Sequence, residues 1–264
     1  MNGGPVEQRG RQSRSNPHRS PSTDHRPPSA DAAFSLRLRA WYRTHGRDLP
    51  WRQTRDPYRV LISELMLQQT QVSRVLGYYG RFIERFPTLA DLARARPRQI
   101  REAWEGLGYY ARARNLHRLA RDVTQRGTAP NDTLPADPVR LRELPGVGEY
   151  TAGAVASFAY ERRAELVDTN VARVIRRAFA PHADFKTAAG KREIWGIARR
   201  LLPRTGRATW THNQALMELG ALVCTARLAR CEECPVRRQC ATGRTAEVSG
   251  AARRRASPDR SRGR

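Results

Sequence analysis

The stretch Leu144-Pro-Gly-Val-Gly-Glu-Tyr-Thr-Ala-Gly153 decides how the middle of this chain folds. Upstream of it, Asp137-Pro138 is typical of a helix N-cap followed by proline at the first helical position, so we expect a short helix as far as Leu144. Downstream, small and apolar residues continue as a second helix. Gly146 and Gly148 predict a tight turn between the two helices, in which the backbone comes very close to a neighbour or takes up unusual φ values.

The start of the second helix predicts an anion site. Amide groups in the first turn of a helix have no acceptor within the helix, and the helix dipole favours negative charge there. The amides of Val147 to Tyr150 could therefore meet an anion such as phosphate. The alternative interpretation is a tight turn between two helices that binds nothing.

The composition indicates a polyanionic partner. The 264 residues include 49 Lys and Arg against 25 Asp and Glu, a net charge of +24. Only Lys186 and Lys191 are lysines; an arginine-rich proteome would explain that choice of residue, but not the excess of base over acid. Such an excess is typical of nucleic-acid-binding proteins. The sequence has no apolar run of membrane-spanning length and no signal-peptide core, so we expect a cytoplasmic, nucleoid-associated protein without membrane contact.

Both ends of the chain differ in composition from the middle. Residues 1–32 and 243–264 are rich in polar residues and arginine and have little to bury, which predicts disordered basic tails. Between them, in residues 33–242, the apolar residues have helical spacing throughout. We find no alternating strand and no internal repeat, so the sequence predicts an all-α fold.

The four cysteines predict a metal centre. Their spacing is C-x6-C-x2-C-x5-C, within one short stretch of a chain that we expect in a reducing compartment, where disulfides are rare. Zinc sites more often show two short Cys pairs separated by a longer loop, whereas one compact loop with four thiolates suits a [4Fe-4S] cluster. The cluster is favoured over zinc, with these ligands: Cys224, Cys231, Cys234 and Cys240.

One carboxylate is predicted to lie inside an apolar helix. Asp56-Pro57 again reads as N-cap and proline, and opens a helix over 58–71 whose residues leave almost no polar face. Glu64 lies in the middle of it. A buried carboxylate must be paired, or its pKa rises until it holds a proton near neutrality, as a general acid requires. The alternative is a core salt bridge to an arginine.

A second carboxylate, Asp168, reads as the N-cap of the helix that begins after it. Capping of this helix would by itself explain why an aspartate stands at this position. However, a carboxylate that accepts hydrogen bonds from helix amides stays ionised. A neutral Glu64 and a charged Asp168 would have the separate roles that cleavage of a glycosidic bond uses.

At these motifs the chain resembles the helix-hairpin-helix DNA glycosylases. Leu144–Gly148 resembles their hairpin, Val167–Val171 resembles the region of their catalytic aspartate, and the cysteine spacing resembles that of the endonuclease III and MutY branches. The resemblance covers about residues 35–241. Three more stretches resemble MutY adenine glycosylases in particular: Leu49–Arg52, Ser63–Gln71 and Gly106–His117.

The resemblance implies a two-lobed fold that flips its target base out of the duplex. A six-helix lobe would span about residues 56–162, a cluster lobe would join 33–55 to 163–242, and the active-site cleft would lie between them. Glu64 would protonate adenine at N7, Asp168 would stabilise the oxocarbenium-like sugar, and Asn170 would help to position Glu64 and the catalytic water. Tyr150 stands where endonuclease III has the lysine that forms a Schiff base, which implies hydrolysis without strand cleavage.

The resemblance also implies a DNA-binding surface. Gln69 and Tyr109 would insert into the duplex and contact the opposite base. For Trp51 and Tyr109 the alternative is ordinary core packing. Five other residues are assigned to the core: Leu76, Trp104, Leu107, Leu116 and Leu119. The adenine pocket would comprise Arg47, Trp51, Arg52 and Gln214. The phosphate-binding hairpin would comprise Gly146, Val147 and Gly148.

One departure from the family leaves the substrate open. MutY proteins usually continue past the cluster into a domain that reads 8-oxoguanine, whereas this sequence has 24 residues after Cys240. We expect a monomer that acts on double-stranded DNA and removes adenine opposite 8-oxoguanine or guanine. The alternatives are a thymine glycosylase for T·G mismatches with the same fold, and a non-catalytic DNA-binding protein that carries the cluster.

Overall fold

The computed structural model describes residue 1 and residues 29–126 and 133–245. Within these ranges the regular secondary structure is helical, apart from one isolated antiparallel bridge between Cys224 and Ala229. The all-α prediction is therefore confirmed. No helix in the described ranges is both long enough and apolar enough to cross a bilayer.

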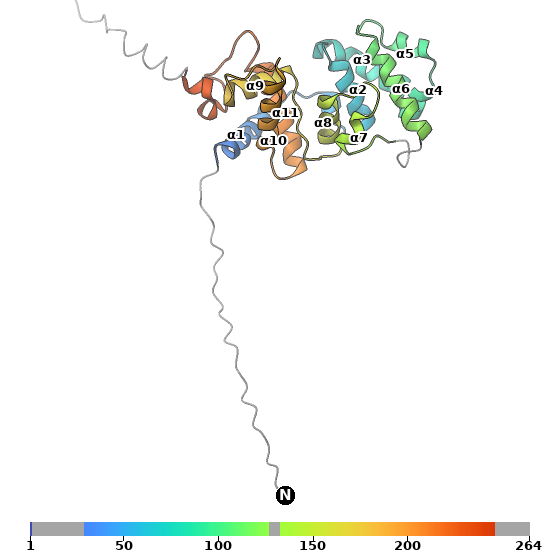
Figure 1. Ribbon diagram of the computed structural model, residues 1–264. Coiled ribbons are helices and arrows are strands. Elements are labelled where there is room, and N and C mark those ends of the chain that lie inside the picture. Colours follow the sequence, from blue (N-terminus) through green and yellow to red (C-terminus); the bar gives the residue numbers. More distant parts are fainter. Residues whose placement is uncertain (2–28, 127–132, 246–264) are drawn as a thin grey trace, which may run out of the picture.

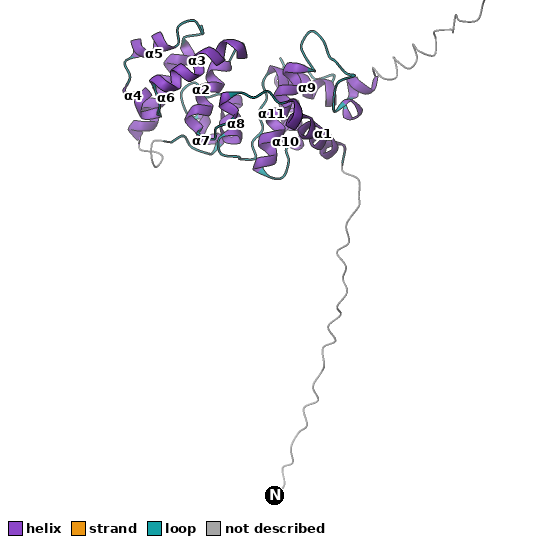
Figure 2. Ribbon diagram, turned by 180° about the vertical axis from the view of Figure 1, so that it is seen from behind, coloured by secondary structure: helices purple, strands orange, loops and turns teal. Residues whose placement is uncertain are grey.

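The helices lie in two groups side by side, and the chain starts in one, crosses to the other and returns (Figures 1 and 2). The first group comprises α1 (Ala30–His45), α9 (Thr169–Phe179), α10 (Ala188–Leu201), α11 (Gly206–Leu222) and the 3-10 turn η3 (Arg237–Gln239). The turn η1 (Pro50–Arg52) leads to the second group: α2 (Pro57–Leu67), α3 (Val72–Arg85), α4 (Leu89–Arg94), α5 (Pro97–Ala103), α6 (Ala111–Arg126), α7 (Pro138–Arg142) and α8 (Glu149–Phe158).

This grouping supports the predicted two lobes, whose proposed bounds are 56–162 and 33–55 with 163–242. Helix α11 packs against α1 and α9 within its own group and also reaches α8 in the other. In the second group α2 packs between α3 and α8. Helices α8 and α11 therefore meet where the two groups adjoin.

Three aspartates cap helices at the positions that the sequence indicates. Asp56 accepts a hydrogen bond from the Tyr58 amide at 2.8 Å, and Asp137 accepts one from Val139 at 3.0 Å. Asp168 accepts one from the Val171 amide at 2.7 Å. A side-chain oxygen at the N-cap pairs an amide that has no acceptor within the helix, so each aspartate fixes where its helix begins.

Several predicted boundaries are wrong. Helix α1 begins at Ala30, with Ser29 as its cap, so residues 30–32 belong to the folded part. A helical turn over 241–245 likewise extends past the predicted boundary at 242. The rest of both predicted tails, residues 2–28 and 246–264, lies outside the described residues. Helix α2 ends at Leu67, four residues before the predicted end, because the side chain of Arg112 donates hydrogen bonds to the carbonyls of its last turn.

The core assignments are confirmed with one exception. Trp104, Leu107, Leu116 and Leu119 are all buried. Leu76, by contrast, is 44% exposed, so its assignment to the core is wrong. The buried face of α3 is formed by Val75, Tyr79 and Phe82, and Leu76 is turned away from that face.

Candidate active site

A pocket of about 670 Å³ lies between the two groups of helices. Glu64 from α2 and Tyr150 from α8 line it on one side. Asp168 and Asn170, at the start of α9, and Gln214 of α11 line it on the other. The structure thus brings together residues that are up to 150 positions apart in the chain. The other predicted site residues in its lining are Arg47, Trp51, Arg52 and Gln69.

Glu64 is buried, with 3% of its surface exposed. The pKa of its carboxyl group is raised to about 7: burial is the largest cause and the negative charge of Asp168 adds to it, while the hydrogen bond from Tyr150 and the charge of Arg52 oppose the rise. The Tyr150 hydroxyl donates to Oε2 of Glu64 at 2.7 Å. Burial holds the pKa of Tyr150 well above its ordinary value, so this phenol remains a donor. The second oxygen, Oε1, is left to carry a proton.

Asp168 is held by two donors and connected to a longer chain of hydrogen bonds. Its Oδ1 accepts from the Val171 amide, and its Oδ2 accepts from Nδ2 of Asn170 at 2.9 Å. The Asn170 Oδ1 in turn accepts from Nη2 of Arg173 at 2.8 Å, and Arg173 Nε donates to the carbonyl of Cys224 at 2.8 Å. The Asp168 carboxylate is therefore fixed in orientation from the helix start and from the side.

Glu218 of α11 organises the arginines of the pocket. It is fully buried and accepts hydrogen bonds from Nε of Arg47 and from Nη2 of Arg52, both at 2.7 Å. Burial by itself would raise the pKa of Glu218, but the hydrogen bonds from the two arginines hold it at about 2. This charged triad fixes both guanidinium groups in the pocket wall, next to Trp51. Trp51 is itself buried and packs edge-on against Tyr79, with 5.4 Å between the ring centroids.

The hairpin between α7 and α8 differs from the prediction in detail. Gly146 has φ +80°, a conformation that favours glycine. Gly148 has φ −85°, and a Cβ atom there would meet no other atom of the protein within 4 Å, so it leaves open space beside the backbone. The Val147 amide donates to the Leu144 carbonyl at 3.1 Å and is not free for an anion, contrary to prediction. No side chain caps the first turn of α8, which leaves the amides that follow Gly148 as the anion-binding candidates.

Two loops next to the pocket, one of which contributes Gln69 to its lining, carry residues in a left-handed conformation. Gln69 has φ +54° and Tyr109 has φ +46°, which is costly for residues other than glycine and persists only where the surroundings enforce it. Tyr109 is 60% exposed, so the core-packing interpretation is wrong for this residue. The two side chains line a common cavity, with Gln68 and Tyr110 beside them.

Arg112, on the first turn of α6, holds these two loops together. Its Nη1 donates to the carbonyls of Leu65, Met66 and Gln68 at 2.7, 2.9 and 2.6 Å. Its Nη2 donates to the carbonyls that precede Tyr109, those of Leu107 at 3.1 Å and Gly108 at 3.2 Å. The guanidinium therefore takes up carbonyl groups at the end of α2, which explains why that helix stops early.

Replacing Arg112 by glutamine should strongly destabilise the protein. A buried carbonyl that loses its donor costs about 1–3 kcal/mol, so with several orphaned at once we expect the free energy of unfolding to fall by roughly 3 kcal/mol or more. Urea denaturation of the two proteins measures this difference. Arg114→Gln, at an exposed position of the same helix, is the matched control; a loss no larger than that of the control would show that Arg112 does not secure the loops.

No lysine lines the pocket among the described residues. Lys191 pairs with Glu149 at 3.5 Å, outside the pocket lining, and is 53% exposed. The residue next to Glu64 is Tyr150, whose phenolic hydroxyl donates to the carboxyl group. As far as the structure describes it, the pocket lining thus presents three carboxyl groups, those of Glu64, Asp168 and Glu218, and one phenol, but no primary amine.

The four cysteines line a common cavity at the end of the first helix group. Arg177 of α9 donates from Nη1 to Sγ of Cys224 at 3.3 Å, and the Gly243 amide donates to Sγ of Cys240 at 3.4 Å. Such donors offset negative charge on thiolate sulfur. In the described part of the chain, no three His, Cys, Asp or Glu side chains lie close enough to share one metal ion.

Three residues that organise this region were not among the predicted site residues: Glu218, Arg112 and Arg173. Glu218 gave the same signal as Glu64, because it lies in the apolar run Ala215-Leu-Met-Glu-Leu219. Nothing in the sequence distinguishes Arg112 and Arg173 from the many other arginines of the chain. Both act by donating to carbonyl groups that are distant in the chain.

The comparisons with known proteins agree with this geometry. Residues 62–200 match the model of the HhH-GPD superfamily of base excision DNA repair proteins. An adenine DNA glycosylase of Mycolicibacterium smegmatis is 45% identical over 202 residues, which are 76% of this chain and 67% of the relative. An adenine DNA glycosylase of Homo sapiens is 42% identical over 217 residues, but the chain spans only 39% of its length.

Solved structures show the same architecture. A thermostable thymine-DNA glycosylase superposes with a TM-score of 0.74 at 30% identity, over 82% of this chain and 97% of that one. An endonuclease III in complex with DNA superposes with a TM-score of 0.66 at 24% identity, over 81% and 95%, which is a likeness of fold alone. The chain belongs to the HhH-GPD superfamily of base excision DNA repair proteins.

Proposed function

We propose that this protein is an adenine DNA glycosylase, which flips a mispaired adenine from the duplex and hydrolyses its glycosidic bond. The observation that carries the proposal is the buried Glu64, whose pKa of about 7 lets it hold a proton at neutral pH, in one pocket with Asp168. The relatives named adenine DNA glycosylase support the choice of base. We further propose that the protein acts as a single chain.

The chemistry follows from the two carboxyl groups. Glu64 donates the proton on Oε1 to N7 of adenine, so that the base leaves as a neutral molecule. Tyr150 keeps Glu64 in place through Oε2. As the glycosidic bond breaks, positive charge develops on the sugar, and the Asp168 carboxylate stabilises it. Water then attacks the sugar carbon and gives up a proton, which the Glu64 carboxylate takes, so that the neutral acid is restored.

The pocket lining contains no amine among the residues that the structure describes, which supports hydrolysis. A glycosylase that also cuts the strand needs an amine nucleophile to form a Schiff base with the opened sugar. Tyr150, with a pKa raised by burial, supplies no such group. We therefore expect an abasic site as the product, with strand breakage only after treatment with alkali.

The surrounding residues fit the recognition of a flipped base. The Glu218 triad fixes Arg47 and Arg52 beside Trp51, and Gln214 lies in the same lining, so donors and an aromatic face surround the space next to Glu64. The amides after Gly148 would bind the phosphate of the target nucleotide. The Gln69 and Tyr109 loops, secured by Arg112, would fill the gap that the base leaves.

Thymine excision from T·G mismatches is the second candidate. The likeness to a thymine-DNA glycosylase structure favours it, at 30% identity against 45% for the mycobacterial adenine glycosylase. Thymine has no N7, so a neutral carboxylic acid next to the base would not have that ring nitrogen to protonate. A non-catalytic DNA-binding protein would not need Glu64 and Asp168 in one pocket.

A panel of duplexes tests the proposal. Single-turnover assays on A·8-oxoG, A·G, A·C and T·G pairs, with chromatographic identification of the released base, should show adenine release from A·8-oxoG and A·G. Thymine release from T·G with adenine untouched would establish the second candidate. Binding without release of any base would establish the third.

We also propose that the four cysteines hold a [4Fe-4S] cluster. They line a common cavity, and one compact loop with four thiolates suits a cluster better than the two separated Cys pairs of most zinc sites. A cluster spreads its four ligands over four irons. The hydrogen bonds from Arg177 and Gly243 would then offset its negative charge.

Metal analysis of the purified protein checks the cluster directly. We expect about four irons per chain and a broad absorbance from sulfur-to-iron charge transfer, which makes the protein brown. Cys234→Ser should lose iron and lower the free energy of unfolding, because metal binding stabilises the fold that presents its ligands. A colourless protein with about one zinc and no iron would contradict the proposal.

A further inference from the structure

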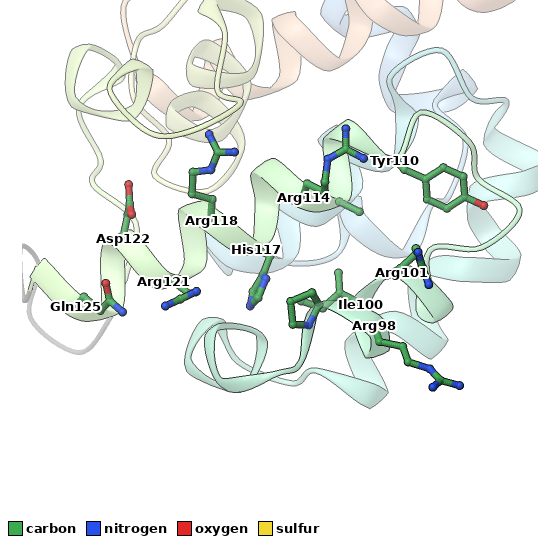
Figure 3. Close-up of a pocket in the computed structure, with 12 residues that line it drawn as sticks. Arg98, Ile100, Arg101, Tyr110, Arg114, His117, Arg118, Arg121, Asp122 and Gln125 are labelled. Carbon is green, nitrogen blue, oxygen red and sulfur yellow. The ribbon is translucent and has the colours of Figure 1, made fainter.

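A basic groove of about 710 Å³ runs between α5 and α6, outside the candidate active site. Figure 3 shows Arg114, Arg118, Arg121 and Gln125 spaced along α6, with Arg98 and Arg101 on α5 beside them. The steps of four, three and four residues place the α6 side chains on one face of the helix. Five of the twelve lining residues are arginines, against one acid, Asp122.

Among the described residues, most arginines of this groove form no ion pair with a carboxylate of the protein. Arg98 pairs with Glu102 at 2.9 Å. No ion pair joins Arg101, Arg118 or Arg121 to any carboxylate among the described residues, and Arg118 and Arg121 are exposed. Like charges gathered without partners repel one another, and a bound polyanion relieves this repulsion.

The groove continues from the loops that would enter the duplex. Tyr110 and Arg114 line both the basic groove and the cavity that holds Gln69 and Tyr109. From Arg114 the arginines follow α6 away from these loops for about 10 Å, at 1.5 Å per residue. A DNA strand carries one charge per about 3.4 Å of helix axis, so two or three phosphates match that length.

We propose that this groove binds the phosphate backbone of the duplex next to the lesion, as a second DNA contact beyond the hairpin. The proposal rests on the proposed function, because the Gln69 and Tyr109 loops must meet the duplex for the backbone to reach Arg118 and Arg121. An acidic segment of a partner protein would match the same charge. The continuity with the loops favours DNA.

The test compares short and extended duplexes. A short duplex reaches about six base pairs on either side of an A·8-oxoG pair, and each long duplex adds about one helical turn, ten base pairs, on one side. The target adenosine carries a 2′-fluorine, which slows base loss, and fluorescence anisotropy reports binding at several salt concentrations. The proteins are the wild type, Arg118→Gln/Arg121→Gln, and the matched control Arg192→Gln/Arg204→Gln, which removes two exposed arginines outside the groove.

We expect one of the two extensions to strengthen binding by the wild type and the control but not by the groove variant. On that duplex the groove variant should bind roughly tenfold more weakly, and its log–log salt slope should be smaller by about two, at about 0.9 per phosphate contact. Equal affinities and slopes for variant and control on every duplex would overturn the proposal and leave the groove to an acidic partner. Base release by the wild type from unmodified duplex is measured separately, so a failure of the proposed function is recognised independently.

Discussion

Replacing Glu64 by glutamine should abolish base release and preserve binding of the mismatched duplex. Glutamine has the shape of the acid and can accept the hydrogen bond from Tyr150, but it has no proton to give to the base. General acid catalysis contributes about 10²–10⁴-fold, so we expect a single-turnover rate at least about 10²-fold lower. Glu193→Gln, an exposed glutamate on α10, is the matched control and should keep the wild-type rate.

The same substitution has a second signature in stability. The pKa of Glu64 is raised from 4.5 to about 7, so between these pH values the native state holds a proton that the unfolded state has lost. The free energy of unfolding of the wild type should therefore fall as pH rises through this window, by about 3 kcal/mol in all. Glu64→Gln should lack that fall. Activity within a few-fold of wild type and an unchanged pH dependence of stability would show that Glu64 is not the acid.

Asp168→Asn should lower the rate of base release by roughly 10²–10³-fold with little effect on folding. Asparagine is as good an N-cap as aspartate, so it can still accept from the Val171 amide, while the charge that would stabilise the sugar cation is lost. Single-turnover base release and thermal unfolding measure the two effects separately. The substitution thus separates capping from catalysis.

Asp137→Asn is the matched control for this charge loss, because Asp137 caps α7 in the same way outside the pocket lining. It should keep the wild-type rate. If Asp168→Asn also keeps that rate, Asp168 serves the fold as a cap and has no part in the chemistry.

The sequence was sufficient to predict features that depend on local chemistry. The Asp-Pro pairs marked the starts of α2 and α7, and the apolar helix around Glu64 predicted the burial that raises its pKa. Both features are set by neighbours in the chain. A cap bonds an amide two or three residues away, and a helix with no polar face is buried wherever it packs.

Features that depend on distant partners could not be predicted in this way. Helix α2 ends early because Arg112, over 40 residues later, bonds its last carbonyls. The exposure of Leu76 depends on which face of α3 meets its neighbours. The role of Glu218 became visible only once Arg47 and Arg52 were placed against it.

The pH dependence of adenine release by the wild type tests the central claim most directly, because the claim is that a neutral Glu64 delivers the proton. The single-turnover rate on an A·8-oxoG duplex should be constant at low pH and should fall about tenfold per pH unit above an apparent pKa of about 7. A rate that stays constant from roughly pH 6 to pH 9, two units past that pKa, would contradict the account.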